Sequence, residues 1–86
     1  MESHIQFPDG SRKPVIMQEN GFADIRKSAD LAGIGRLEMY PVDPDEGIVV
    51  FVDEEGLYKE LESNYHVEYA EVIYGPAIVV ATELVE

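Results

Sequence analysis

The sequence predicts a small α+β domain: a mostly antiparallel sheet of four to five strands, with one principal helix packed on one face. Two runs of five residues, Ile48–Val52 and Ala77–Ala81, are continuously apolar, as expected of strands buried on both faces. Apolar residues recur at helical spacing over about three turns in one segment, from Phe22 to Ala32. Clusters of Pro, Gly, Asn and Asp divide the remaining chain into short pieces.

The first element expected is a hairpin. His4–Phe7 alternates and stops at Pro8-Asp9-Gly10, a turn signal in which glycine supplies a positive φ. Pro14–Gln18 can pair back with it.

The helix should follow, with Asn20 as its N-cap and Gly33 ending it in the left-handed conformation. Ile34 is placed to fold back onto the last turn. The apolar face of this helix is expected to carry Phe22, Ile25, Ala29 and Ala32.

A second hairpin occupies the middle of the chain. Arg36–Tyr40 alternates, which predicts a strand with one buried and one exposed face. An acidic connection of five residues, Asp43–Gly47, joins it to Ile48–Val52, and a second acidic turn, Asp53–Gly56, ends that strand.

The last third is expected to contain one helical turn at Leu57–Leu61 and a loosely alternating strand at Val67–Tyr74. Gly75-Pro76 interrupts the chain before Ala77–Ala81. The two continuous apolar runs are natural neighbours in the sheet.

Residues 1–86 are expected to form a single domain, because a chain of 86 residues has no material for a second core. It contains no cysteine, so neither a disulfide nor a thiolate metal site is expected. No apolar run approaches the roughly 20 residues that span a bilayer, and no secretory signal is visible. These features predict a cytoplasmic protein that does not bind membranes.

The charge distribution is unusual. Residues 1–36 are neutral, with as many bases as acids, whereas residues 37–86 contain Lys59 as their one base and carry the whole net charge of −12. Direct binding to nucleic acid is not expected, because there is no basic footprint to displace counterions. A net-acidic surface that aids solubility is one interpretation. A surface that occupies the basic, nucleic-acid-binding face of another protein is the other.

Several short motifs follow one another from the helix onward, over roughly residues 15–82. They are Gly33 and Gly35 after the helix, Leu37-Glu38-Met39, Pro41, Asp53-Glu54-Glu55-Gly56, Asn64, and the segment Ile73–Val80. In the order and spacing of these motifs, with no single motif decisive, the chain resembles the bacterial and phage family known as domain of unknown function 3846. Glycines separated by Ile34 and the neighbours of Asn64 depart from the usual pattern. The resemblance implies an origin in bacteria, phage or another mobile element, and brings no activity with it.

No cofactor or metal site is expected. Asp43, Asp45 and Glu54 have the outline of a calcium loop, but Ile48 stands where the sharp turn needs glycine and an apolar strand follows. Gly33-x-Gly35 lies between a helix and a strand, the reverse of a dinucleotide-binding order. Asn64 is expected to cap a turn through its amide, or to belong to a functional surface.

The function expected is therefore that of a small, acidic, non-enzymatic protein-binding module, whose partner has a basic surface and whose oligomeric state stays open. The alternative is a small-ligand or metal-dependent enzyme that uses the acidic turns. The candidate protein-binding residues are Asp43, Asp45, Glu46, Asp53, Glu54, Glu55, Tyr58, Asn64 and Tyr65. Mimicry of a phosphate backbone requires the carboxylates of Asp43, Asp45, Glu46, Asp53, Glu54, Glu55, Glu60 and Glu62 to share one face.

Overall fold

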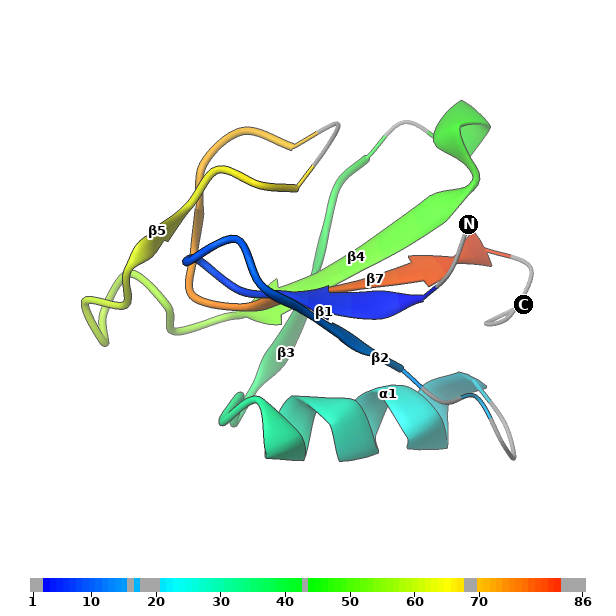
Figure 1. Cartoon of the computed structure of the whole chain (residues 1–86), viewed down its shortest axis with the longest axis horizontal. Helices are drawn as coiled ribbons and strands as arrows, with labels where there is room; N and C mark the ends of the chain where they lie inside the picture. The colour runs from blue at the N-terminus through cyan, green and yellow to red at the C-terminus, as the bar shows by residue number, and fades with distance from the viewer. Residues whose placement is uncertain (1–2, 16, 18–20, 43, 68–69, 83–86) are drawn as a thin grey trace.

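A computed structural model confirms the predicted α+β architecture and describes residues 3–15, 17, 21–42, 44–67 and 70–82 (Figure 1). One helix, α1, packs against a five-stranded antiparallel sheet. In chain order the elements are β1 (His4–Gln6), β2 (Arg12–Pro14), α1 (Gly21–Leu31), β3 (Leu37–Tyr40), the short 3-10 helix η1 (Pro44–Glu46), β4 (Ile48–Asp53), β5 (Ser63–Asn64), β6 (Ile73–Tyr74) and β7 (Ala77–Ala81).

The strand order in the main sheet is β2-β1-β7-β4-β3, and every neighbouring pair is antiparallel. The predicted adjacency of the two apolar runs is confirmed, because β4 pairs with β7 in the register Val50↔Val79. The predicted hairpin between β3 and β4 is also confirmed, with Met39 opposite Phe51. β5 and β6 form a separate two-stranded sheet.

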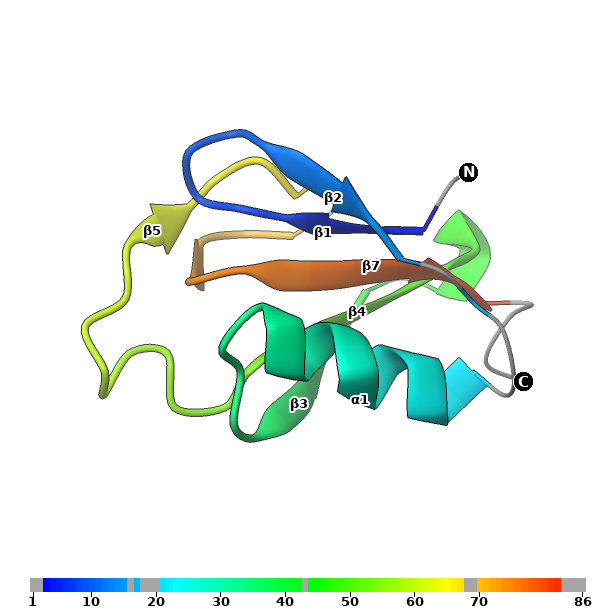
Figure 2. The same cartoon turned by 60° about the horizontal axis from the view of Figure 1, so that its bottom comes forward.

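The two faces of the main sheet are covered by different means (Figure 2). On one face, Ile25 and Ala29 of α1 pack with Phe51 and Ile78 of the sheet. On the other face there is no helix among the described residues; instead the chain after β5 supplies Val67 and Ile73, with further side chains packed around them. Both continuous apolar runs are thereby removed from water.

The helix ends as predicted. Gly33 has a φ of +78°, and its amide donates to Asp30 O while the amide of Ile34 donates to Ala29 O. This pair of hydrogen bonds is the Schellman motif, and Ile34 is 2% exposed where it folds back onto the helix. Asn20, the expected N-cap, lies outside the described residues.

Phe22 differs from the prediction, because its side chain is 65% exposed. The buried side of α1 carries Asp24 and Ser28 as well as Ile25 and Ala29. With about 100° per residue, that arc is centred well to one side of Phe22, which leaves the phenyl ring at its margin.

The partner strand of β1 is earlier than expected, at Arg12–Pro14 rather than at Pro14–Gln18. The reason is a tight turn: the amide of Gly10 donates to Phe7 O and the amide of Phe7 donates to Ser11 O, so pairing resumes directly after the turn. Residues 16 and 18 lie outside the described part of the chain.

Two other local predictions were only partly right. Leu57–Leu61 forms hydrogen-bonded turns and no regular helix. Within the alternating segment at Val67–Tyr74, Ile73–Tyr74 is the part that the structure assigns to a strand, and residues 68 and 69 are outside the described residues.

We expect Val50→Asp to abolish folding. Val50 is 0% exposed, between β3 and β7, so the substitution would bury an uncompensated carboxylate. Val50→Ala is the matched control, expected to lose about 2 kcal/mol while keeping a cooperative transition. Thermal unfolding followed by circular dichroism distinguishes the two, and a Val50→Asp variant melting within a few degrees of the wild type would contradict the sheet order.

Candidate functional site

The segment Glu54–Glu62, here called the acidic loop, connects β4 to β5 and is organised around the buried carboxylate of Asp53. The side chain of Asp53 is 1% exposed. One of its oxygens accepts from the amide of Glu55 at 2.9 Å, and the other accepts from Lys59 Nζ at 3.0 Å. The single base of the acidic half of the chain is therefore used to neutralise a buried acid.

Backbone hydrogen bonds fix the rest of the acidic loop. The amide of Glu54 donates to Arg36 O at its start, and the amide of Gly75 donates to Glu62 O at its end. Between them, the amide of Leu61 donates to Gly56 O and the amide of Glu60 donates to Leu57 O, a second Schellman arrangement. Glu60 stands at its left-handed position, with a φ of +54°.

Gly56 is required because the loop passes close to β6. A Cβ at this position would collide with the carbonyl oxygen of Tyr74. The acidic loop is thus packed against the body of the domain along its inner side.

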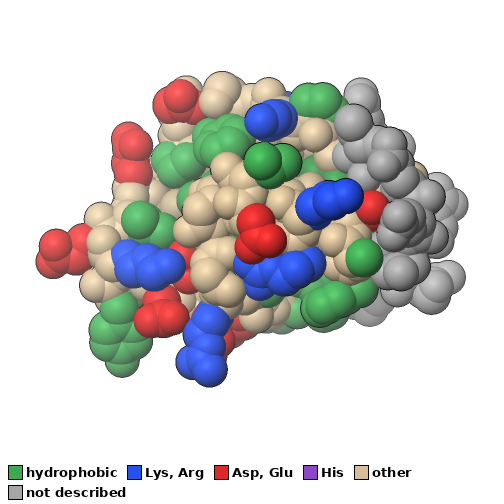
Figure 3. Space-filling model, turned by 90° about the horizontal axis from the view of Figure 1, so that it is seen from below, with side chains coloured by type: hydrophobic (Ala, Val, Ile, Leu, Met, Phe, Trp, Pro, Cys, Tyr) green, Lys and Arg blue, Asp and Glu red, His purple; other side chains and the backbone are tan. Residues whose placement is uncertain are grey.

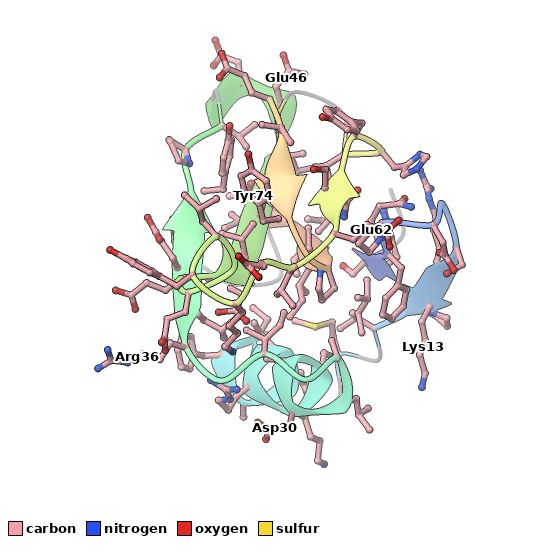
Figure 4. The ribbon with its side chains drawn as sticks, turned by 90° about the vertical axis from the view of Figure 1, so that its left-hand side faces the viewer. Lys13, Asp30, Arg36, Glu46, Glu62 and Tyr74 are labelled. Carbon is pink, nitrogen blue, oxygen red and sulfur yellow. The ribbon has the colours of Figure 1, made fainter. Side chains whose placement is uncertain are left out.

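Its outer side presents an unusual combination of side chains. Leu57 is 67% exposed and Tyr58 is 90% exposed. The same loop carries the carboxylates of four exposed residues, Glu54, Glu55, Glu60 and Glu62. Figure 4 views this side of the molecule, with Glu62 and Tyr74 labelled near its centre. Leu57 is not among the candidates that the sequence gives, because its spacing with Leu61 predicts only a helical turn.

Asn64 lies in the interior, 0% exposed, and so cannot belong to a contact surface in this structure. Its Nδ2 donates to Gln6 O at 2.9 Å and to Gly75 O at 3.0 Å, while its Oδ1 accepts from the amide of His66 at 3.1 Å. The side chain connects β1 with the start of β7 and with the chain that covers the second face. The geometry therefore supports a structural role for the Asn64 amide.

A further contact joins the same regions at the surface. His66 Nε2 lies 3.1 Å from Pro8 O in the turn between β1 and β2. In that turn, hydrogen bonds from the side chain and the backbone amide of Ser11 lower the pKa of the Asp9 carboxyl below its ordinary value.

The other candidates are not brought together. Asp45 and Glu46 lie on η1, before β4, whereas Glu54 and Glu55 follow it. Six residues of strand separate the two pairs, about 20 Å at roughly 3.3 Å per residue. Tyr65 is 75% exposed and follows β5, and Asp43 lies outside the described residues.

The condition set for mimicry of a phosphate backbone is therefore not met by the full set of carboxylates. Asp53 is buried and paired with Lys59, so it is also removed from the candidate contact residues. Those that remain exposed divide between the two ends of β4.

Positive charge gathers on the helix side. Figure 3 views the molecule from that side and shows Lys and Arg side chains distributed over it. Arg26 of α1 bridges to Asp30 at 2.9 Å and donates to the carbonyl oxygens of Ile34 and Gly35. In Figure 4, Lys13 and Arg36 lie toward α1, and Glu46 lies at the opposite end of the molecule.

The described part of the chain contains neither a metal-binding cluster nor a membrane-spanning helix. No group of three or more His, Cys, Asp or Glu residues there could hold a metal ion. No helix within it has the length and apolar character needed to cross a membrane.

Comparisons with protein-family profiles, with curated proteins and with solved structures gave no match.

We expect Asn64→Asp to destabilise the domain by more than about 3 kcal/mol, because a carboxylate would face two buried carbonyl oxygens. Asn64→Ala should cost about 2 kcal/mol, since it leaves Gln6 O and Gly75 O without their donor. Urea denaturation measures both. Equal stability of the two variants and the wild type would contradict the role assigned to this amide.

Millimolar calcium or magnesium should raise the melting temperature no more than sodium chloride of equal ionic strength does, because the acidic turns offer screening but no ligand cage. Differential scanning calorimetry tests this directly. A divalent-specific rise that saturates at micromolar concentration would contradict the expectation and direct attention to Glu54 and Glu55.

Proposed function

We propose that this protein is a non-enzymatic protein-binding module and that the acidic loop contacts its partner. The observation that carries the proposal is the exposure of Leu57 and Tyr58, at 67% and 90%, on a loop that is hydrogen-bonded at both ends and in its middle.

Physical reasoning supports a binding role for this pair. Large exposed apolar side chains gain free energy when a partner covers them, and tyrosine is enriched among the residues that dominate binding energy. A loop already fixed by Asp53, Lys59 and its backbone bonds loses little conformational entropy on binding. The arrangement favours association over exposure to water.

The carboxylates of the acidic loop indicate the charge of the partner's surface. Glu54, Glu55, Glu60 and Glu62 would be attracted to a protein surface rich in Lys and Arg, and would accelerate its diffusional encounter. The same charges would repel phosphates, so direct nucleic-acid binding is not part of the proposal. Solubility accounts for exposed carboxylates but not for an exposed leucine and tyrosine between them.

The proposed contact is smaller than the one that mimicry of a phosphate backbone would require. The contact is the acidic loop alone, against a basic surface of limited extent, rather than a row of carboxylates that follows a nucleic-acid groove. The resemblance to domain of unknown function 3846 adds the expectation of a bacterial or phage origin, and we place the encounter in the cytoplasm.

Capture from a lysate of the native host, with mass spectrometry, tests the proposal. Wild type should retain a basic protein that Tyr58→Ala loses, because truncation of a central anchor typically weakens binding at least about tenfold. Glu46→Lys, at the other end of β4, is the matched control and should still capture it.

With the purified partner, Glu54→Lys combined with Glu55→Lys should slow association and flatten its salt dependence, since the exposed charges steer the encounter. Their exposure predicts little change in stability. Surface plasmon resonance at several salt concentrations gives both quantities. Unchanged capture by Tyr58→Ala, together with unchanged association rates, would exclude the acidic loop as the contact.

A further inference from the structure

The two edges of the main sheet are protected to different degrees. β2 is one edge, and it carries exposed Arg12 and Lys13 and ends at Pro14, which has no amide hydrogen to offer. β3 is the other edge, paired with β4 alone, and it exposes Met39 at 61%. Charged residues and proline are common means of protecting an edge, whereas an exposed apolar residue invites pairing.

Two hydrogen bonds at the ends of β4 determine which residues of β3 bond to β4 and which point outward. The amide of Glu54 donates to Arg36 O, which places the even-numbered residues of β4 in hydrogen-bonded pairs with β3. The amide of Thr82 donates to Gly47 O, which directs the odd-numbered residues toward β7. The two hydrogen bonds agree, because both assign the even-numbered residues of β4 to β3 and the odd-numbered residues to β7.

Glu38 and Tyr40 therefore bond inward to β4, and the amide and carbonyl groups of Leu37 and Met39 point outward. Within the described residues, no hydrogen bond satisfies these outward groups. The outer edge of β3 is thus a set of donors and acceptors in the geometry of a strand, open to pairing with another chain. In Figure 4, β3 forms the left margin of the ribbon, above the labelled Arg36.

The side chains along this edge specify what could pair with it. Met39 lies on the face that carries Phe51 and α1. Glu38 lies on the other face, opposite Val52, and Tyr40 on that face accepts from the amide of Glu71. One face of the edge is apolar and exposed, and the other is acidic.

We propose that the outer edge of β3 binds an extended segment of a partner protein by strand addition, with an apolar residue opposite Met39 and a basic residue opposite Glu38. Main-chain bonds to Leu37 and Met39 would supply affinity, and the alternation of apolar and basic side chains would supply specificity. This inference is independent of the acidic loop, and it names a second contact and its chemistry.

A second copy of the chain fits this edge less well. An antiparallel pairing of two β3 strands that places Leu37 opposite Met39 brings the two Glu38 carboxylates face to face, which is destabilising. Each copy also carries a net charge of −12. Charge complementarity therefore selects a basic segment.

The test uses a capped synthetic peptide, Lys-Val-Lys-Val-Lys, with two controls. One has N-methylated valines, which keep the charge but remove the donors on the edge that would face β3. The other replaces each lysine by glutamate. Nuclear magnetic resonance hydrogen exchange is measured at each backbone amide.

At a peptide concentration ten times its Kd, hydrogen exchange of the Leu37 and Met39 amides should slow about tenfold. The reason is that these amides then exchange with solvent only in the small fraction of protein that is free of peptide. The amides of Arg12 and Lys13 on the other edge should be unchanged. Both control peptides should give no protection. Glu38→Lys should weaken binding of the lysine peptide about fivefold, since attraction between the paired strands becomes repulsion. Glu46→Lys changes the net charge of the protein equally and should leave the affinity for the peptide unchanged.

Equal protection by the N-methylated peptide would overturn the proposal, because it would show binding by charge alone. So would protection outside β3, or slow exchange of Leu37 and Met39 in a dimer without peptide. The acidic loop is tested separately, by capture with Tyr58→Ala, so one proposal can fail without the other.

Discussion

The pairing of β4 with β7 is the constraint on which the other elements depend. Both strands are apolar at nearly every position, so neither face of the sheet centre can stand in water. The described part of the chain contains one α-helix, which covers one face of the sheet. The segment between β5 and β7 therefore covers the other face, although β6 is the one regular element among its described residues. Asn64 makes that arrangement possible, because its amide gives this irregular segment bonds to β1 and to the turn before β7.

The sequence was sufficient where one local pattern decided the outcome. Continuous apolar runs identified β4 and β7, and helical spacing followed by Gly33-Ile34 identified α1 and its end. It was insufficient where the outcome depended on distant contacts. The amide of Asn64 bonds to a residue 58 positions away, and no local pattern encodes that. Asp53 looked like one more exposed acid, and its burial follows from the ion pair with Lys59 six residues later. Phe22 shared the apolar spacing of α1, but which arc of the helix faces the sheet was set by packing.

The same constraint explains where binding surfaces remain. The acidic loop lies beyond the end of β4, where its inner side is fixed by Asp53 and Gly56 and its outer side is left to solvent. The edge of β3 is left because the helix and the second layer cover faces and not edges. Lys and Arg side chains are seen on the helix side (Figure 3), whereas the exposed candidate acids lie on η1 (Asp45 and Glu46) and on the acidic loop (Glu54, Glu55, Glu60 and Glu62). The domain thus offers two separate places for a partner, which differ in chemistry: an anchored loop with two apolar side chains among carboxylates, and a strand edge with an apolar and an acidic face.

The central claim is that the acidic loop is ordered before any partner arrives, because a flexible loop would have to be ordered at the moment of binding. Backbone ¹⁵N relaxation of the isolated protein measures this most directly. The bonds made by Asp53, Gly56 and Leu61 predict order parameters for residues 54–61 of about 0.85, equal to those of β4. Order parameters below about 0.6 for Leu57 and Tyr58 would contradict the account, since these two side chains would then be part of a mobile segment and not a fixed contact surface.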